Sequence, residues 1–149
     1  MLSAINTALA AFSVVTLANA TYYVSDSVLI QNNGRTLRGR GPSSSSVIVI
    51  DSTTTVPAVV IGKADPIASG RIFGALLDGF ILSGGGNASR TRHAIEVQRG
   101  ERVQINSCRS IGFYSGIAFY GGQFNSVSDW NHGGGGTATV IAGTSCIKV

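Results

Sequence analysis

The sequence predicts an all-β protein that winds as a parallel β-solenoid with about 22 residues in each coil. We call this period the coil step. Short apolar strands recur at it: Ile95–Val97 is followed one coil step later by Ile117–Phe119, and then by Thr139–Ile141. A second set, Val103–Ile105 and Asn125–Val127, keeps the same period. No helical pattern separates these strands, and a constant period in this range is typical of repeat architectures.

Alternation within each strand predicts the core. Successive side chains of a strand point to opposite faces, so Ile95 and Val97 point one way and Glu96 the other. The coil step then predicts two inward columns, Ile95–Ile117–Thr139 and Val97–Phe119–Ile141. Stacking such columns buries a continuous apolar core.

Residues 1–20 are predicted to cap the first coil with a short helix and a first strand. Ile5, Leu9 and Phe12 have helical spacing within Ala4–Phe12, and Val14–Leu17 is a short apolar run. A cap is expected because the first coil of a solenoid has a bare apolar end.

A secretory signal peptide is the alternative for this segment, because Ala18-Asn19-Ala20 resembles a cleavage site. The positive charge that normally begins such a peptide is missing, since the first basic residue is Arg35. The segment is also too polar and too short to span a membrane.

Residues 21–149 are predicted to form the coils. Further strands are expected at Tyr22–Val24, Val28–Ile30, Val47–Ile50, Ala58–Ile61 and Ala75–Leu82. Insertions between these strands make the coil step clean only after His93. The repeat stops at Ser145–Val149 without a capping sequence, so we expect either a fragment of a longer protein or an end covered by an oligomer, such as a homotrimer.

A β-sandwich is the alternative fold. It would be built from antiparallel hairpins with two-residue turns, for which Asn33-Gly34 and Asp78-Gly79 are candidates. The second of these lies inside a repeated strand segment, which favours the solenoid.

The opening of the chain resembles a known superfamily. A helix of the type AINTALAAF, a strand, TYYVSDSVLI and then TLRGRG are similar to the first coils of pectate-lyase-like proteins, the phage tailspikes in particular. The resemblance implies a right-handed parallel β-helix that is extracellular or virion-associated and recognises or cleaves polysaccharides. It also implies Ca²⁺ as the only cofactor to consider. The paired acids of polygalacturonases are missing at Gly143–Cys146.

Composition excludes several classes of protein. Charged residues make up only 12% of the chain, and its net charge of +4 comes from scattered arginines. A nucleic-acid groove would need basic residues interleaved with aromatics, so no nucleic-acid partner is expected. Cys108 and Cys146 are separated by more than one coil step and less than two, so they share no column and no disulfide is predicted.

Asp129, Trp130 and His132 form the most concentrated group of functional side chains. A carboxylate and an imidazole can transfer protons, and an indole can stack on a sugar, so Asp129 and His132 are the candidate catalytic residues. The alternative is a loop in which Asp129 makes a turn and Trp130 covers the edge of the coil.

Further substrate-binding candidates are exposed aromatic, basic and acidic residues near these strands: Trp130, Tyr120, Tyr114, Arg92, His93 and Glu96. Glu96 has no acidic neighbour in its column, and hydrolysis of a glycan usually requires two carboxylates. The sequence therefore predicts a polysaccharide-binding protein, either a glycoside hydrolase or lyase or a non-catalytic structural or adhesion module.

Overall fold

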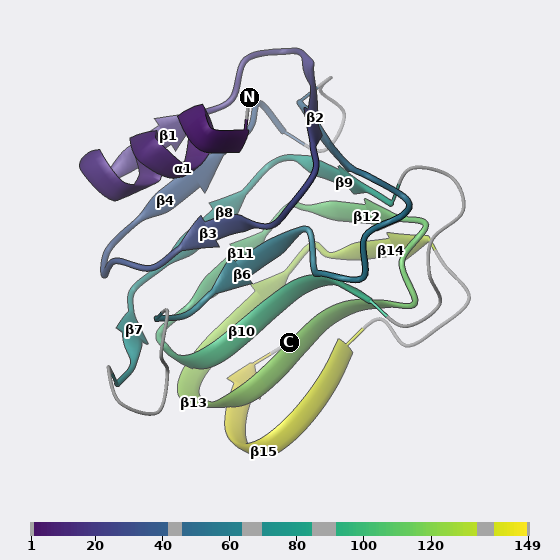
Figure 1. The fold of residues 1–149 in the computed structure, drawn as a ribbon. Helices are drawn as coiled ribbons and strands as arrows, with labels where there is room; N and C mark the ends of the chain where they lie inside the picture. The colour runs from purple at the N-terminus through teal and green to yellow at the C-terminus, as the bar shows by residue number, and fades with distance from the viewer. Residues whose placement is uncertain (1, 42–45, 64–69, 85–91, 134–138, 149) are drawn as a thin grey trace.

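The computed structural model describes residues 2–41, 46–63, 70–84, 92–133 and 139–148 of the chain. Strands that pair in parallel make up most of this part, with one short helix at the N-terminal end (Figure 1). Every strand pair in the described ranges is parallel. The prediction of an all-β protein with parallel sheets is confirmed, and the antiparallel hairpins of a β-sandwich do not occur in these ranges.

The larger sheet has ten strands and curls around the core (Figure 1). Its strands form two rows that β13 (Ser115–Ser128) joins. The first row contains β1 (Val14–Thr16), β4 (Thr36–Arg38), β8 (Leu76–Asp78), β11 (Gln104–Asn106) and the end of β13. The second row contains β3 (Val28–Ile30), β6 (Val59–Ile61), β7 (Ile72–Phe73), β10 (His93–Glu101), the start of β13, and β15 (Thr139–Lys148).

The smaller sheet covers the remaining side of the core. It contains β2 (Thr21–Val24), β5 (Val47–Ile50), β9 (Ile81–Ser83), β12 (Arg109–Ile111) and β14 (Asn131–Gly133). Its strand order is β14-β12-β9-β5-β2, so β2 is an edge strand.

In the later strands, residues pair with residues one coil step further along the chain. Ile95 pairs with Ile117 and Val97 with Phe119, and Ile117 pairs with Thr139. The first four of these side chains are fully buried, which confirms the inward columns as far as β13. The side chains of Thr139 and Ile141 lie outside the described part. Contrary to expectation, the same step also occurs before His93, because Val14 in β1 pairs with Thr36 in β4.

The N-terminal helix, α1 (Leu2–Ala11), covers β3 and β1. Ile5 and Leu9 are buried against the core as predicted, and the side-chain amide of Asn6 bonds the backbone of Ser27 and Leu29. The placement of Phe12 was wrong. Its side chain is 64% exposed, because the helix ends one residue before it.

Two columns of left-handed residues bend the chain between strands. Gly34, Gly74, Arg102 and Phe124 have φ of 66°, 68°, 55° and 56°, and each lies two residues before strand residues that pair in register. Gly79, Ser107 and Asp129 form the second column, with φ of 70°, 49° and 50°. Non-glycine residues rarely adopt this conformation, so the corners at Arg102, Phe124, Ser107 and Asp129 cost conformational free energy that the stacked strands offset.

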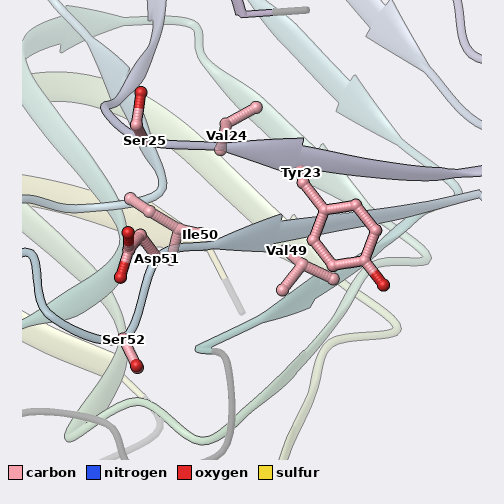
Figure 2. A pocket seen from close by; sticks show the side chains of 7 residues that line it. All are labelled: Tyr23, Val24, Ser25, Val49, Ile50, Asp51 and Ser52. Carbon is pink, nitrogen blue, oxygen red and sulfur yellow. The ribbon is translucent and has the colours of Figure 1, made fainter.

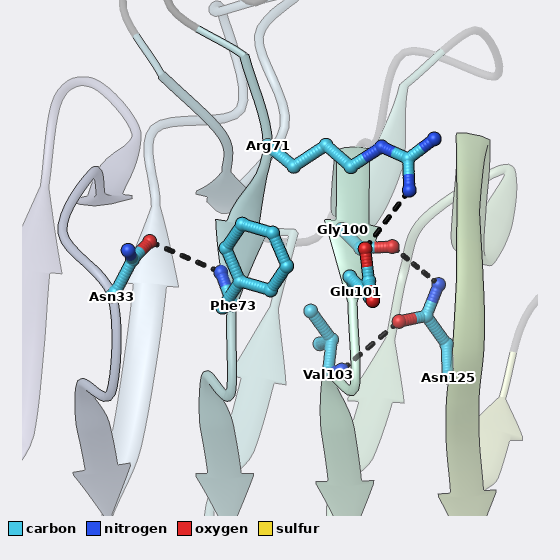
Figure 3. A network of polar contacts seen from close by, with 7 residues as sticks. All are labelled: Asn33, Arg71, Phe73, Gly100, Glu101, Val103 and Asn125. Atoms are coloured by element: carbon cyan, nitrogen blue, oxygen red, sulfur yellow. Dashed lines mark hydrogen bonds and ion pairs between the residues drawn. The ribbon is translucent and has the colours of Figure 1, made fainter.

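Buried and half-buried polar side chains support the first corner (Figure 3). Asn125 accepts a hydrogen bond from the backbone N–H of Val103 at 2.9 Å and donates one to the carbonyl of Gly100 at 3.1 Å. Outside it, Arg71 and Glu101 form an ion pair at 2.9 Å. An unpaired buried backbone group is costly, so Asn125 stabilises the corner by bonding groups that the bend leaves without a partner.

Arg102→Gly tests the strain at this corner. Arg102 is exposed, so we expect the glycine to raise the free energy of unfolding in urea by about 0.5–1 kcal/mol, because it adopts a positive φ without steric cost. Gln104→Gly is the matched control, since Gln104 is exposed two residues later inside β11 and the same change should there lower stability by about 0.5–1 kcal/mol. If both variants lost the same free energy of unfolding, the backbone at Arg102 would not be strained.

Candidate functional site

Parallel pairing of β10 with β13 brings together three of the residues that the sequence singled out. His93 pairs in register with Ser115, Glu96 with Ala118, and Gln98 with Tyr120. His93, Glu96 and Tyr120, with Ser115 and Gln98, define what we call the His93 cluster. Because all five are on two hydrogen-bonded strands of one sheet, their spacing is fixed by the backbone.

His93 joins two hydroxyl groups. Its Nδ1 bonds to Oγ of Ser115, and its Nε2 lies 3.1 Å from the hydroxyl of Tyr120. The two rings also touch edge to face, with centroids 6.2 Å apart and planes at 61°. These contacts hold the Tyr120 ring in one orientation while leaving 39% of the residue exposed.

A carboxylate completes the cluster. Oε1 of Glu96 accepts a hydrogen bond from Nε2 of Gln98 at 2.5 Å. Partial burial, and secondarily the nearby charge of Glu96, raise the pKa of the Tyr120 phenol above its usual range. The phenol is therefore neutral at physiological pH, and the surface offers an aromatic ring beside a carboxylate and an amide.

Ser115 of the His93 cluster and Cys108 are both inaccessible. Ser115 lies next to an imidazole, as an activated serine would, but its residue is fully buried. The thiol of Cys108 is buried as well, and burial raises its pKa to about 12. Neither side chain can therefore attack a ligand on this surface as the structure stands.

Arg92 points away from this surface. Only 1% of the residue is exposed. Its Nη1 donates to the carbonyl oxygens of Asp51 and Thr54 and to the Thr54 hydroxyl, at 2.8–3.0 Å, and its Nη2 donates to the carbonyl of Gly84 at 2.6 Å. The guanidinium also lies over the ring of Phe113 at 5.2 Å. Arg92 was predicted to contact substrate, but in this structure its residue is buried and its two Nη groups bond to the protein itself.

Asp129, Trp130 and His132 do not converge on one surface. Asp129 is exposed at the second left-handed corner, whereas Trp130 packs against the hydrophobic core. His132 continues a core-facing column that runs through Ile48, Leu82 and Ser110. Trp130 therefore covers the edge of the core, and it is not aimed at a ligand together with Asp129.

His132 is held from the core side. Its Nδ1 lies 2.7 Å from Oγ of the fully buried Ser110, and its Nε2 is buried without a hydrogen-bond partner among the described residues. Burial lowers the pKa of His132 below its ordinary value, against a smaller upward effect of the Tyr114 backbone. Tyr114 is exposed, and its backbone N–H donates to the carbonyl oxygen of Arg92.

Five of the six described carboxylates each accept a hydrogen bond or form an ion pair, and no two of them share a partner. These pairs are Asp26 with Ser27, Asp51 with Thr53, Asp78 with Arg38, Glu96 with Gln98, and Glu101 with Arg71. The sixth is Asp129, and Asp65 lies outside the described residues. No hydrogen-bond or ion-pair partner in this part of the chain therefore links two carboxylates.

The described residues do not fit a bound metal ion. No three of their His, Cys, Asp or Glu side chains gather at one point. Ca²⁺ needs six to eight oxygen ligands, several of them usually carboxylates, so the calcium implied by the pectate-lyase-like resemblance has no cluster here to hold it. No helix in the same ranges is long and apolar enough to cross a membrane.

Comparisons with known proteins assign no function to the site. No protein-family model matches the chain, and neither the curated proteins nor the solved structures contain a match.

Sequence reasoning missed Ser115 and Gln98. Ser115 could have been found, since it lies one coil step after His93 and therefore beside it. Gln98 has the same outward direction as Glu96, two residues along β10, and was within reach of the same alternation.

Arg92→Lys tests the structural role of the guanidinium. A lysine cannot reach the Asp51–Thr54 turn and Gly84 together, so we expect the free energy of unfolding in urea to fall by about 2–4 kcal/mol. Arg109→Lys, at an exposed position of β12, should change it by less than about 0.5 kcal/mol. A similar small change in both variants would show that the Arg92 hydrogen bonds contribute little.

The lowered pKa of His132 predicts a pH dependence of stability. The unfolded chain takes up the proton at the ordinary pKa of 6.5, whereas the folded chain resists it. The free energy of unfolding should therefore fall as the pH drops below about 6.5. Urea titrations at about pH 7.5 and 5 should show a smaller fall for His132→Gln than for the wild type, with His93 unchanged in both. If the free energy of unfolding fell equally in both proteins, His132 would not be the residue responsible for the pH dependence.

Proposed function

We propose that the chain is a right-handed parallel β-helix that binds a polysaccharide on the outer surface of β10 and β13. The parallel pairing and the recurring coil step support the β-helix. The N-terminal helix over β3 and β1 supports the capping role of residues 1–20. The similarity of the opening strands to pectate-lyase-like proteins supports an extracellular or virion-associated location.

The observation that carries the binding function is the orientation of Tyr120. Its exposed ring is fixed by His93, so little side-chain freedom is lost when a sugar stacks on it. Glu96 and Gln98 lie beside the ring and supply acceptors and a donor for sugar hydroxyls. The carboxylate favours a sugar unit without a negative charge at this position.

Binding without cleavage is the form of this function that the geometry supports best. The described carboxylates are scattered over separate partners, and His132 faces the core. Hydrolysis with inversion or retention needs two carboxyl groups within about 10 Å across the bond that breaks. We therefore propose an adhesion or structural module rather than a hydrolase or lyase.

Tyr120→Ala should weaken polysaccharide binding by about 3- to 10-fold, because it removes the stacking surface. Tyr120→Phe keeps the ring but loses the bond to His93, so a smaller loss is expected. Binding is measured by isothermal titration calorimetry, after a panel of neutral and acidic polysaccharides has identified a ligand. Phe12→Ala, which removes an exposed ring beside the N-terminal helix, is the control and should bind like the wild type.

Two results would overturn the proposal. Binding to none of the polysaccharides, or equal binding by wild type and Tyr120→Ala, would remove the glycan site. New reducing ends or unsaturated products during the same incubations would show that the protein is an enzyme.

A further inference from the structure

A second surface feature lies on the smaller sheet, away from the His93 cluster. An open groove of about 430 Å³ is bordered by the ends of β2 and β5 and by the turn that follows each of them (Figure 2). Its lining residues are Tyr23, Val24, Ser25, Val49, Ile50, Asp51 and Ser52. The volume is within the usual range for small-molecule sites.

One wall of the groove is apolar. Tyr23 and Val49 pair in register on the outer face of the sheet, and Figure 2 shows the phenol ring of Tyr23 lying beside Val49. Tyr23 is 71% exposed, the most of any large apolar residue described. Val24 and Ile50 point the other way and are buried in the core, which fixes the two strands beneath the ring.

The other side of the groove carries a positioned carboxylate. Oδ1 of Asp51 accepts hydrogen bonds from the backbone N–H of Thr53 at 2.9 Å and from its hydroxyl at 2.8 Å. These two bonds lower the pKa of Asp51, so the carboxylate is ionised at neutral pH. The turn itself is held from inside by Arg92, which bonds the carbonyl oxygens of Asp51 and Thr54.

The electrostatics of the lining select a class of ligand. Asp51 is the only acidic residue among the seven lining residues, and none of the seven is basic. The groove thus presents one exposed carboxylate next to an aromatic ring, with the charge of Arg92 buried behind the turn. A carboxylate and an aromatic face together attract an organic cation, and an anionic ligand would be repelled.

We propose that this groove binds a protonated amino sugar. The ammonium group lies against the Asp51 carboxylate, the apolar face of the ring lies on Tyr23 and Val49, and the hydroxyls of Ser25 and Ser52 border its polar substituents. The site is independent of the His93 cluster, since it is built from different strands and a different sheet.

The test compares three sugars that share one ring and differ in charge: D-glucosamine, D-glucose and D-glucuronate. Each is titrated into the ¹⁵N-labelled full chain while the amide resonances are followed by NMR. We expect glucosamine to shift the amides of Tyr23, Asp51 and Ser52 and to bind several times more tightly than glucose, with no saturable shift from glucuronate.

Asp51→Asn separates charge from structure, because an asparagine Oδ1 can still accept the two hydrogen bonds from Thr53. This variant should bind glucosamine about two- to fivefold more weakly, at the level of glucose. Asp78→Asn is the matched control: it removes the same charge from the larger sheet, keeps an acceptor for Arg38, and should bind like the wild type.

Equal binding of all three sugars, or unchanged glucosamine binding by Asp51→Asn, would overturn the proposal. Shifts confined to the amides of β10 and β13 would also overturn it, and would instead support the glycan surface at Tyr120. If Tyr23→Ala kept an intact fold but lost the amide shifts at the groove and also those at β10 and β13, the two sites would not be independent.

Discussion

Parallel pairing between strands that repeat the same pattern of side chains is the constraint on which the rest of this structure depends. Two core-facing residues of β10 meet apolar residues of β13, since Ile95 lies on Ile117 and Val97 on Phe119. The side-chain period of a strand is two residues, and a slip of one residue would turn the core columns outward. The corners must therefore hold the strands in phase. Left-handed residues do this at the same position in successive repeats, even where the residue is Arg102 or Phe124 rather than glycine.

The same constraint explains which functional side chains meet. His93 and Ser115 touch because they are register partners, and Tyr120 reaches His93 from the strand beside it. Arg92 directly precedes β10, and its side chain bonds the loops at Asp51, Thr54 and Gly84. β10 and the residue before it thus supply an outer surface for a ligand and an internal clamp for the Asp51–Thr54 turn. That clamp links the stability of the fold to the shape of the groove below Tyr23.

The part of the fold that follows a fixed step could be predicted from the sequence, and the part that depends on insertions could not. The coil step identifies the columns of β10 and β13, and it also places Ser115 beside His93. Tyr23 pairs with Val49, and Val49 with Ser83, across two separations that are both longer than the coil step and unequal to each other. No constant step predicts such pairs, so the groove and its carboxylate were invisible until the strands were placed side by side.

The separation of Trp130 and His132 from Asp129 has a related cause. Proximity in sequence suggested that Asp129, Trp130 and His132 form one site, but residues next to a corner are separated by its bend. Trp130 lies one coil step after Cys108, and His132 one coil step after Ser110, and both earlier residues are buried. The repeat thus indicated an inward direction for both side chains. In a fold of stacked strands, the residue one step away along the chain is better evidence of a neighbour than the residue two positions away, and a functional site should be sought along columns rather than along segments.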